Sequence, residues 1–391
     1  MHKRWMMLFL LCSWACALGL ALGEPARDLT SECTYFSKGT ERRFGLLYDQ
    51  SYARDWRSAR KRHPYLEVTL PEGARCSGVQ IKWGKVNPDW VVEIPVEGAW
   101  VPVEQEPGEY LTTFTPLPSV SSFRIAAHQR LEDRLSIHEL IVLGEGERPA
   151  SIQVWEPTYE KADLLLVAAH PDDEYVFMGG TIPYYGKEQG KRVLVAYLTK
   201  STAERRTELL DGLWRAGQTH YPVLGRFDDL YTTSLSEAYK AVGERKAKRA
   251  MIELFRHHKP EVVVTHDAGG EYGHGMHRVC ADLVVSALEG SGNPQVEAEL
   301  AEQYGLWDVK KCYLHLYPEA PVTLDWHRPL AAFEGQTAFE VAEAAFACHL
   351  SQQKTEYVVY DEGPYDAKQF GLYRSLVGED VRKDDFFEHL P

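Results

Sequence analysis

The sequence lacks the patterns of several common protein classes. After residue 22 it contains no apolar run long enough to cross a bilayer, so we expect no transmembrane span in the mature chain. Basic residues are in the minority, with 43 Lys and Arg against 57 Asp and Glu and a formal net charge of −14. Such an acidic chain lacks the basic face that binds nucleic acid or anionic lipid, so we expect no nucleic-acid partner.

The sequence also lacks the motifs of a cysteine zinc ribbon and of a serine or cysteine nucleophile. The seven cysteines show no Cys-x-x-Cys spacing, which argues against a zinc ribbon. The chain has no Gly-x-Ser-x-Gly elbow and no recognised Cys–His nucleophile motif, which argues against a serine or cysteine nucleophile. Any hydrolytic chemistry must therefore come from other groups.

The first 23 residues have the layout of a secretory signal peptide. A basic start at residues 2–4 precedes an apolar stretch at 6–22, and the small residues Ala21 and Gly23 come just before Glu24. An uncleaved anchor is the alternative, but the apolar stretch is at the short limit for a bilayer span. We therefore expect cleavage and a secreted or cell-surface protein, in which five of the seven cysteines remain.

Residues 30–147 carry short runs of alternating apolar residues separated by turn signals. The runs lie at 65–70, 78–83, 90–94, 100–103, 122–126 and 137–142. Strands this short and this evenly spaced predict an all-β sandwich domain. The order of the runs around Leu66, Val79, Phe123 and Ile137 resembles the discoidin-like, galactose-binding-like family. The resemblance implies a carbohydrate-binding module, and the alternative is a structural appendage that shields an enzyme domain.

A polar junction at 144–149 predicts a domain boundary, and the periodicity changes after it. Apolar runs at 164–169, 192–198, 261–265 and 311–316 alternate with helical patterns at 175–189, 203–216, 236–257, 277–288 and 337–351. Alternating strands and helices predict an α/β fold over residues 160–391. We expect a Rossmann-like, mainly parallel sheet with helices on both faces.

The run at 164–169 ends abruptly in polar residues. His170 and Pro171 are followed by the three carboxylates Asp172, Asp173 and Glu174. Proline suits the first position of a helix, and acidic residues suit its first turn. The chain is therefore expected to turn from strand to helix here, at the sheet edge where α/β proteins bind ligands. Alone, the motif also fits a capped helix start without function.

A second loop follows the strand predicted at 261–265. It contains His274 and His277, whose spacing of three residues places both on one face of a helix. Parallel strands that end at the same edge bring the two loops together. His170 and Asp173 with one of these histidines then form a His₂Asp set, which is typical of a zinc site with open coordination. We expect Zn²⁺, and Fe²⁺ also suits this ligand set.

At these residues the chain resembles the PIG-L/LmbE-like family of zinc-dependent deacetylases, which act on N-acetylglucosamine-type groups. The Ala-His-Pro-Asp-Asp-Glu pattern of the family is matched by residues 169–174, and its Tyr-Gly-His-x-x-His pattern by residues 272–277. The resemblance implies that His170, Asp173 and His277 hold the metal.

The same resemblance implies the catalytic roles. Asp172 is expected to be the general base, and His274 to support the oxyanion or act as the acid, with Tyr272 close to it. The chain departs from many relatives between the two histidines, where Gly275 and Met276 replace Pro-Asp. This departure leaves the ligands intact and removes a carboxylate near His274.

Substrate contacts are predicted at two charged positions. Arg205 stands in an Arg-x-x-Glu pattern after the second strand, and Asp228 follows further along the chain. Arg206 and Asp229 are adjacent alternatives. For each of the four, solvated surface charge is the competing interpretation.

The expected function is that of an exported metal-dependent hydrolase. It would remove the N-acetyl group from an N-acetylglucosamine-type sugar or glycan, with hydroxide formed on zinc as nucleophile and Asp172 as general base. The expected partner is an amino-sugar-containing glycan or small molecule. Two alternatives stay open: a metal-dependent amidase acting on a non-sugar acyl amine or glycolipid, and a catalytically inactive carbohydrate-binding surface protein.

Overall fold

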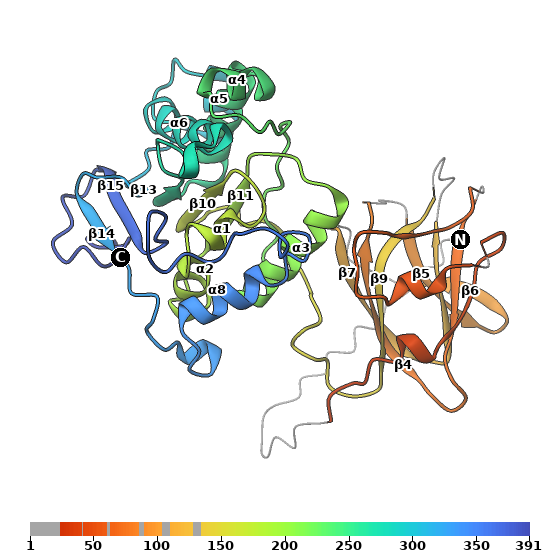
Figure 1. The fold of residues 1–391 in the computed structure, drawn as a ribbon. Helices are drawn as coiled ribbons and strands as arrows, with labels where there is room; N and C mark the ends of the chain where they lie inside the picture. Colours follow the sequence, from red (N-terminus) through yellow and green to blue (C-terminus); the bar gives the residue numbers. More distant parts are fainter. Residues whose placement is uncertain (1–23, 41, 61–62, 86–89, 104–109, 128–133) are drawn as a thin grey trace, which may run out of the picture.

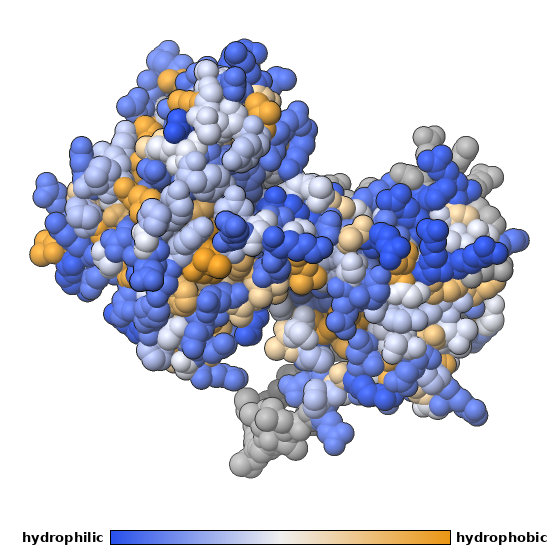
Figure 2. All heavy atoms as spheres, viewed as in Figure 1, coloured by the Kyte–Doolittle hydropathy of each residue, from blue (hydrophilic) through white to orange (hydrophobic). Residues whose placement is uncertain are grey.

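The computed structural model describes residues 24–40, 42–60, 63–85, 90–103, 110–127 and 134–391. They form an all-β lobe and an α/β lobe that lie side by side (Figure 1). The face shown in Figure 2 is mostly hydrophilic, with apolar residues scattered over both lobes. None of the helices in the described part of the chain has the length and apolar character of a bilayer span. The predicted signal peptide, residues 1–23, lies outside the described residues.

The all-β lobe consists of two antiparallel sheets packed on a shared core, which confirms the predicted sandwich. One sheet has the order β1-β3-β8-β5-β6 and the other β2-β9-β4-β7. The strands are β1 Thr34–Phe36, β2 Trp56–Arg57, β3 Tyr65–Thr69, β4 Cys76–Trp83, β5 Trp90–Val96, β6 Ala99–Pro102, β7 Thr112–Val120, β8 Ser122–Ala127 and β9 Ser136–Gly144. Short 3₁₀ turns lie at Thr30–Glu32 and Phe44–Leu47.

The sequence pattern did not predict β1, β2 or β7. Strand β7 contains Pro116 and Pro118, and prolines argue against a central strand because they cannot donate to the ladder. The structure resolves the conflict by placing β7 at the edge of its sheet, where, within the described part of the chain, it pairs only with β4.

The α/β lobe contains a six-stranded sheet of order β11-β10-β12-β13-β15-β14. Its strands are β10 Leu164–Ala168, β11 Val193–Tyr197, β12 Val262–Thr265, β13 Lys311–His315, β14 Pro321–Thr323 and β15 Gln369–Ser375. The first four in this order pair in parallel, and β15 and β14 add antiparallel pairs. The predicted Rossmann-like, mainly parallel sheet is therefore confirmed.

Both faces of this sheet are covered. Alternate residues of β10 enter opposite cores: Leu164 and Leu166 pack on one side, and Leu165 and Val167 on the other. Helices α3 and α8 lie on the first side, and α4, α5 and α6 on the second (Figure 1). The helices are α1 Asp173–Val176, α2 Thr181–Pro183, α3 Ala203–Arg215, α4 Leu235–Val242, α5 Glu244–His258, α6 Gly275–Gly290, α7 Ala298–Tyr304 and α8 Ala338–Phe346.

Two predicted helices are interrupted by glycines with positive φ. The pattern at 175–189 becomes α1, α2 and a π-helical turn at Tyr184–Glu188, because Gly179 has φ 51°. A Cβ at Gly179 would lie 2.7 Å from the indole nitrogen of Trp326, so close packing also demands glycine there. The pattern at 236–257 is divided into α4 and α5 at Gly243, which has φ 75°.

Helix α3 joins the two lobes. Lys82 of β4 donates to the carboxylate of Asp211 over 2.7 Å, and the hydroxyl of Tyr52 donates to the same carboxylate. One turn away on α3, Thr207 Oγ1 lies 2.9 Å from Nδ1 of His138 in β9. The sandwich therefore contacts the helix that follows the second strand of the α/β sheet.

Candidate metal and catalytic site

The candidate site lies where β10 and β12 end. A cavity of about 130 Å³ opens there. It is lined by six of the eight predicted site residues, namely His170, Asp172, Asp173, Arg205, Tyr272 and His274. Because the two strands are parallel neighbours, the loops that follow them meet at the carboxyl edge of the sheet, as predicted.

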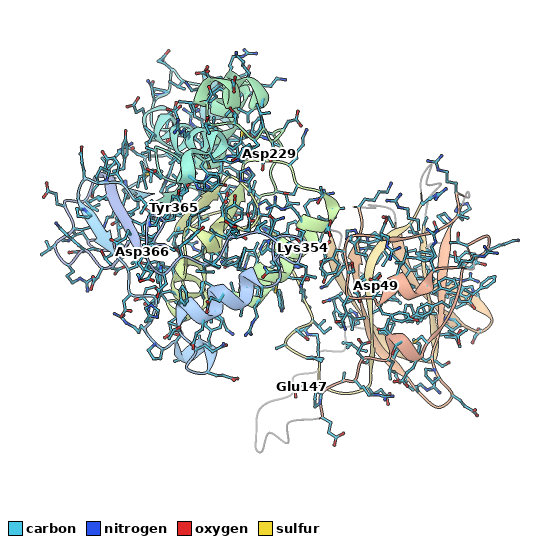
Figure 3. The ribbon with its side chains drawn as sticks, viewed as in Figure 1. Asp49, Glu147, Asp229, Lys354, Tyr365 and Asp366 are labelled. Atoms are coloured by element: carbon cyan, nitrogen blue, oxygen red, sulfur yellow. The ribbon has the colours of Figure 1, made fainter. Side chains whose placement is uncertain are left out.

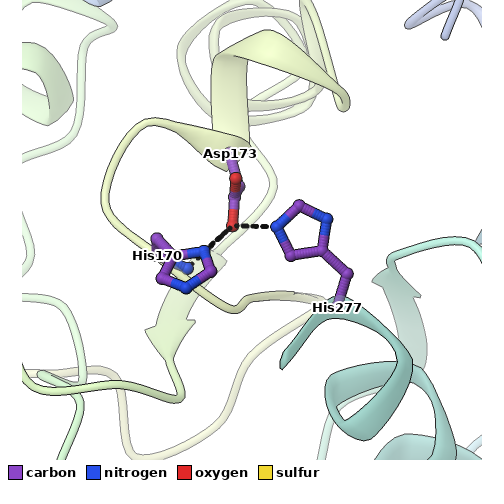
Figure 4. A group of neighbouring side chains, drawn as sticks. All are labelled: His170, Asp173 and His277. Atoms are coloured by element: carbon purple, nitrogen blue, oxygen red, sulfur yellow. Dashed lines mark hydrogen bonds and ion pairs between the residues drawn. The ribbon is translucent and has the colours of Figure 1, made fainter. Parts of the chain in front are cut away.

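The three predicted metal ligands converge on this edge (Figure 4). Oδ2 of Asp173 lies 3.1 Å from Nδ1 of His170 and 3.5 Å from Nε2 of His277. Ligand atoms held tetrahedrally at about 2.0–2.1 Å from a zinc ion lie about 3.3–3.4 Å apart, so these spacings fit one ion. His277 is fully buried, and among the described residues its Nε2 has no hydrogen-bond partner. A buried acceptor of this kind suits a cation.

Glu271 contacts the ring nitrogen of His277 that faces away from the predicted metal position. Oε2 of Glu271 accepts hydrogen bonds from Nδ1 of His277 and Nδ1 of His266, each over 2.8 Å, and Oε1 accepts from Nδ1 of His315 over 2.7 Å. With its proton on Nδ1, His277 presents an unprotonated Nε2 to the cavity, which is the form that binds a metal.

His266 and Glu271 also stand close enough to His277 to suggest a second ion site. Nε2 of His266, however, already accepts the backbone N–H of Ala169 over 2.9 Å. These residues therefore orient the ligand rather than bind an ion themselves. The sequence pattern did not single out His266, Glu271 or His315, although His266 directly follows a predicted strand and His315 lies near the end of another.

Asp172 is buried and held in an unusual backbone conformation. Its φ is 115°, a backbone angle that residues other than glycine seldom adopt. The backbone N–H of Asp172 donates to Oε2 of Glu174 over 2.8 Å. Arg205 Nη2 lies 3.1 Å from Oδ1 of Asp172. Burial, together with the charge of Asp173, raises the pKa of Asp172 to about 7. A carboxyl with this pKa is suited to exchange protons near neutral pH.

His274 caps the N-terminus of α6. Its Nδ1 accepts the backbone N–H of Met276 over 3.1 Å, so the neutral ring carries its proton on Nε2. Burial and the neighbouring His277 and His170 lower the pKa of His274 to about 3. The ring is therefore neutral at pH 7 and can donate from Nε2. Tyr272 lies beside it, with a ring centroid distance of 5.6 Å.

Of the adjacent alternatives for substrate contact, the structure places Arg205 and Asp229 at the cavity. Asp228 is exposed and pairs with Nζ of Lys200 over 3.0 Å, outside the cavity, so the structure does not bring this predicted residue to the site. Asp229 is labelled in Figure 3, and its Oδ1 lies 3.1 Å from Nε2 of His170. With its Nε2 proton held there, His170 turns Nδ1 toward Oδ2 of Asp173, so that both atoms could face one cation. Arg206 is not among the lining residues.

Comparisons with known proteins identify relatives of the α/β lobe. The family model described as "PIG-L: GlcNAc-PI de-N-acetylase" matches residues 165–288. The 1D-myo-inositol 2-acetamido-2-deoxy-alpha-D-glucopyranoside deacetylase 2 of Saccharopolyspora erythraea is 30% identical over 256 residues, which are 58% of this chain and 87% of that protein.

Solved structures are similar to each lobe. N,N'-diacetylchitobiose deacetylase from Pyrococcus horikoshii matches with a TM-score of 0.38 and 21% identity, over 49% of this chain and 71% of that chain. A family 32 CBM from C. perfringens, solved in complex with galactose, matches with a TM-score of 0.25 and 18% identity, over 30% of this chain and 97% of that chain.

Proposed function

This chain belongs to the PIG-L family, and we propose that it is an exported zinc-dependent N-deacetylase that removes the N-acetyl group of an N-acetylglucosamine-type sugar. The observation that carries the proposal is the convergence of His170, Asp173 and His277 at one sheet edge, beside a buried Asp172. The deacetylase activity named for the Saccharopolyspora relative supports the reaction type and the amino-sugar substrate.

His170, Asp173 and His277 would hold the ion, with Asp229 and Glu271 orienting the two imidazoles. When bound, a zinc ion there lowers the pKa of a water molecule and polarises a carbonyl group. The residues that surround these ligands account for the remaining steps.

Asp172 is the proposed general base. It lies next to ligand Asp173 in the sequence, lines the cavity, and has a pKa of about 7, so its carboxylate can take the proton of an attacking water at neutral pH. The Arg205 guanidinium, 3.1 Å away, holds the carboxylate in place. The proton that Asp172 accepts is then available for the departing amine.

His274 is the proposed hydrogen-bond donor to the acetyl oxygen. Since its Nδ1 accepts from Met276, its Nε2–H can stabilise negative charge that develops on that oxygen. A pKa of about 3 favours this role over that of a general acid, because the neutral ring has no extra proton to give. The water oxygen bonds to the carbonyl carbon, the C–N bond breaks, and the products are acetate and the free amino sugar.

Acetate release is the direct test of this function. Zinc-loaded protein should release acetate from N-acetylglucosamine substrates and much less from a simple N-alkyl acetamide. Chelation should abolish release, and added zinc should restore it. Equal turnover of the non-sugar acetamide would favour the amidase alternative. No release from any amino sugar by fully zinc-loaded protein would favour the inactive surface protein.

The proposal of export rests on the basic and apolar composition of residues 1–23. Determination of the N-terminus of protein recovered from outside the producing cell should give Glu24. An intact Met1 would contradict cleavage.

A further inference from the structure

Tyr231 is an exposed aromatic residue at the mouth of the cavity. Its side chain lines the cavity, yet 77% of the residue is accessible to solvent. Its ring meets the ring of His274 edge-on, with centroids 5.2 Å apart. One edge of the phenol ring therefore packs beside the proposed catalytic histidine, and most of the ring remains available to a ligand.

The loop that carries Tyr231 is anchored at both ends. The carbonyl of Phe227 accepts the N–H of Lys200 over 2.7 Å, and the carbonyl of Thr232 accepts the N–H of Gly275 over 2.6 Å. A Cβ at position 275 would lie 2.8 Å from the side chain of Thr232, so the glycine permits this close approach. Tyr231 is thus presented in a fixed place, which lowers the entropic cost of binding a ligand.

The surroundings of Tyr231 favour a neutral polar ligand. Asp229 lies two residues away at the cavity, and the guanidinium of Arg205, which also lines the cavity, pairs with Asp172. Tyr357 and Gln352 also line the cavity. At the mouth, a phosphate or carboxylate placed beside Asp229 would be repelled, whereas an uncharged hydroxylated ring would not.

We propose that Tyr231 forms a second sugar subsite, which stacks against the ring linked to the N-acetylated sugar. This inference rests on the proposed function, because it assumes that the acetyl group reaches Asp172 and His274 inside the cavity. The linked ring then lies at the mouth, where Tyr231 is. A sugar ring has a face of C–H groups and a rim of hydroxyls, which match the flat apolar ring and polar tip of a tyrosine. The substrate is accordingly an oligosaccharide or longer glycan.

Kinetics on one sugar and on two linked sugars test the subsite. Wild-type enzyme should have a kcat/KM about tenfold higher for N,N'-diacetylchitobiose than for N-acetylglucosamine, since one aromatic stack contributes about that factor. Tyr231→Ala should bring this ratio close to one, mainly by raising KM for the disaccharide. Tyr231→Phe keeps the aromatic ring and should keep this kcat/KM ratio. The matched control is Leu230→Ala, at an exposed neighbouring position outside the cavity lining.

Two outcomes would overturn the subsite. One is a wild-type enzyme that does not discriminate between the two sugars. The other is an equal loss on both sugars in Tyr231→Ala, which would assign Tyr231 to the support of His274 alone. If neither sugar is deacetylated, the proposed function fails, but calorimetry of disaccharide binding still tests the subsite. Zinc-loaded Asp172→Asn protein should bind the disaccharide about tenfold more tightly than the Asp172→Asn, Tyr231→Ala double variant, and equal affinities would refute the subsite.

Discussion

At the scale of single residues, the adjacent aspartates 172 and 173 differ in role because of their surroundings. Asp173 faces the imidazoles of His170 and His277, whereas Asp172 faces Arg205 and the cavity. Asp172→Asn removes the proposed base without removing a ligand. We expect turnover to fall by about 10²–10⁴-fold, while metal analysis still finds the wild-type zinc content. Loss of zinc in this variant would reassign Asp172 as a ligand.

Asp228 and Asp229 form a matched pair for a second prediction. Only Asp229 contacts His170, whereas Asp228 is exposed and pairs with Lys200. Because partners that orient a ligand tune metal affinity, Asp229→Asn should weaken zinc binding by about 10–100-fold. Asp228→Asn should bind zinc as the wild type does. Competition titration against a zinc-chelating dye measures both, and equal affinities in the two variants would contradict the proposed orientation of His170.

At the scale of elements, the break between α4 and α5 depends on one glycine. Gly243 has φ 75°, and among the described residues a Cβ there would come within 4 Å only of Cδ of Lys246, at 3.9 Å. The cost of Gly243→Ala is therefore backbone strain without a clash, which we expect to lower the free energy of unfolding by about 1–2 kcal/mol.

The control for this variant is Gly45→Ala. Gly45 has no positive φ and no neighbour that a Cβ would meet within 4 Å, so alanine there should leave stability unchanged or raise it by up to about 1 kcal/mol. Denaturant titration compares the two variants with the wild type. An equal destabilisation in both would show that strain at Gly243 is not the cause.

At the scale of the whole molecule, the two lobes are connected by polar contacts that are largely buried. The Lys82–Asp211 pair has side-chain exposures of 11% and 15%, and Asp211 also accepts from Tyr52. Lys82→Met leaves the Asp211 carboxylate without its cation, and we expect a loss of about 3 kcal/mol in stability.

Helix α3 also carries Arg205, so loosening its junction with the sandwich should lower kcat more than it changes zinc content. Calorimetry and kinetics test this variant together. The Lys161–Glu261 pair lies within the α/β lobe and is more exposed, so Lys161→Met serves as the control. A Lys82→Met protein with wild-type stability and turnover would contradict a supporting role for the sandwich.

Glu139 makes the stability of the molecule depend on pH. It is buried in β9 opposite Lys82, and burial raises its pKa to about 7, although Lys82 opposes the shift. Because the folded state binds this proton more tightly than the unfolded state, the contribution of Glu139 to stability is present below about pH 4.5 and is lost as the pH rises to about 7. In Glu139→Gln this loss should disappear. Denaturant titration at pH 5 and pH 7.5 measures the free energy of unfolding of both proteins. A difference in this free energy between variant and wild type that is the same at both pH values would contradict the role assigned to Glu139.

Much of the fold was predictable because its signals are local. Uninterrupted apolar runs such as 164–169 identify strands buried on both faces, and the alternation with helical patterns implies a parallel sheet. The antiparallel strands β14 and β15 were not predicted, because β15 pairs with β13 and β14 pairs with β15, and pairings between distant segments leave no periodic pattern in the sequence. The two interrupted helices show the same limit. The sequence pattern around Gly179 and Gly243 is compatible with a continuous helix, but in the folded chain both glycines adopt a positive φ.

The positions of the predicted metal ligands could be read from the sequence, because the residues after two neighbouring parallel strands must meet at one sheet edge. The residues that orient these predicted ligands became apparent from the folded structure alone. Glu271 reaches His277, Asp229 rather than Asp228 reaches His170, and the sandwich reaches α3. Such choices depend on loop paths and side-chain directions over a few ångströms. These are set by the packing of distant segments, which no short stretch of sequence records.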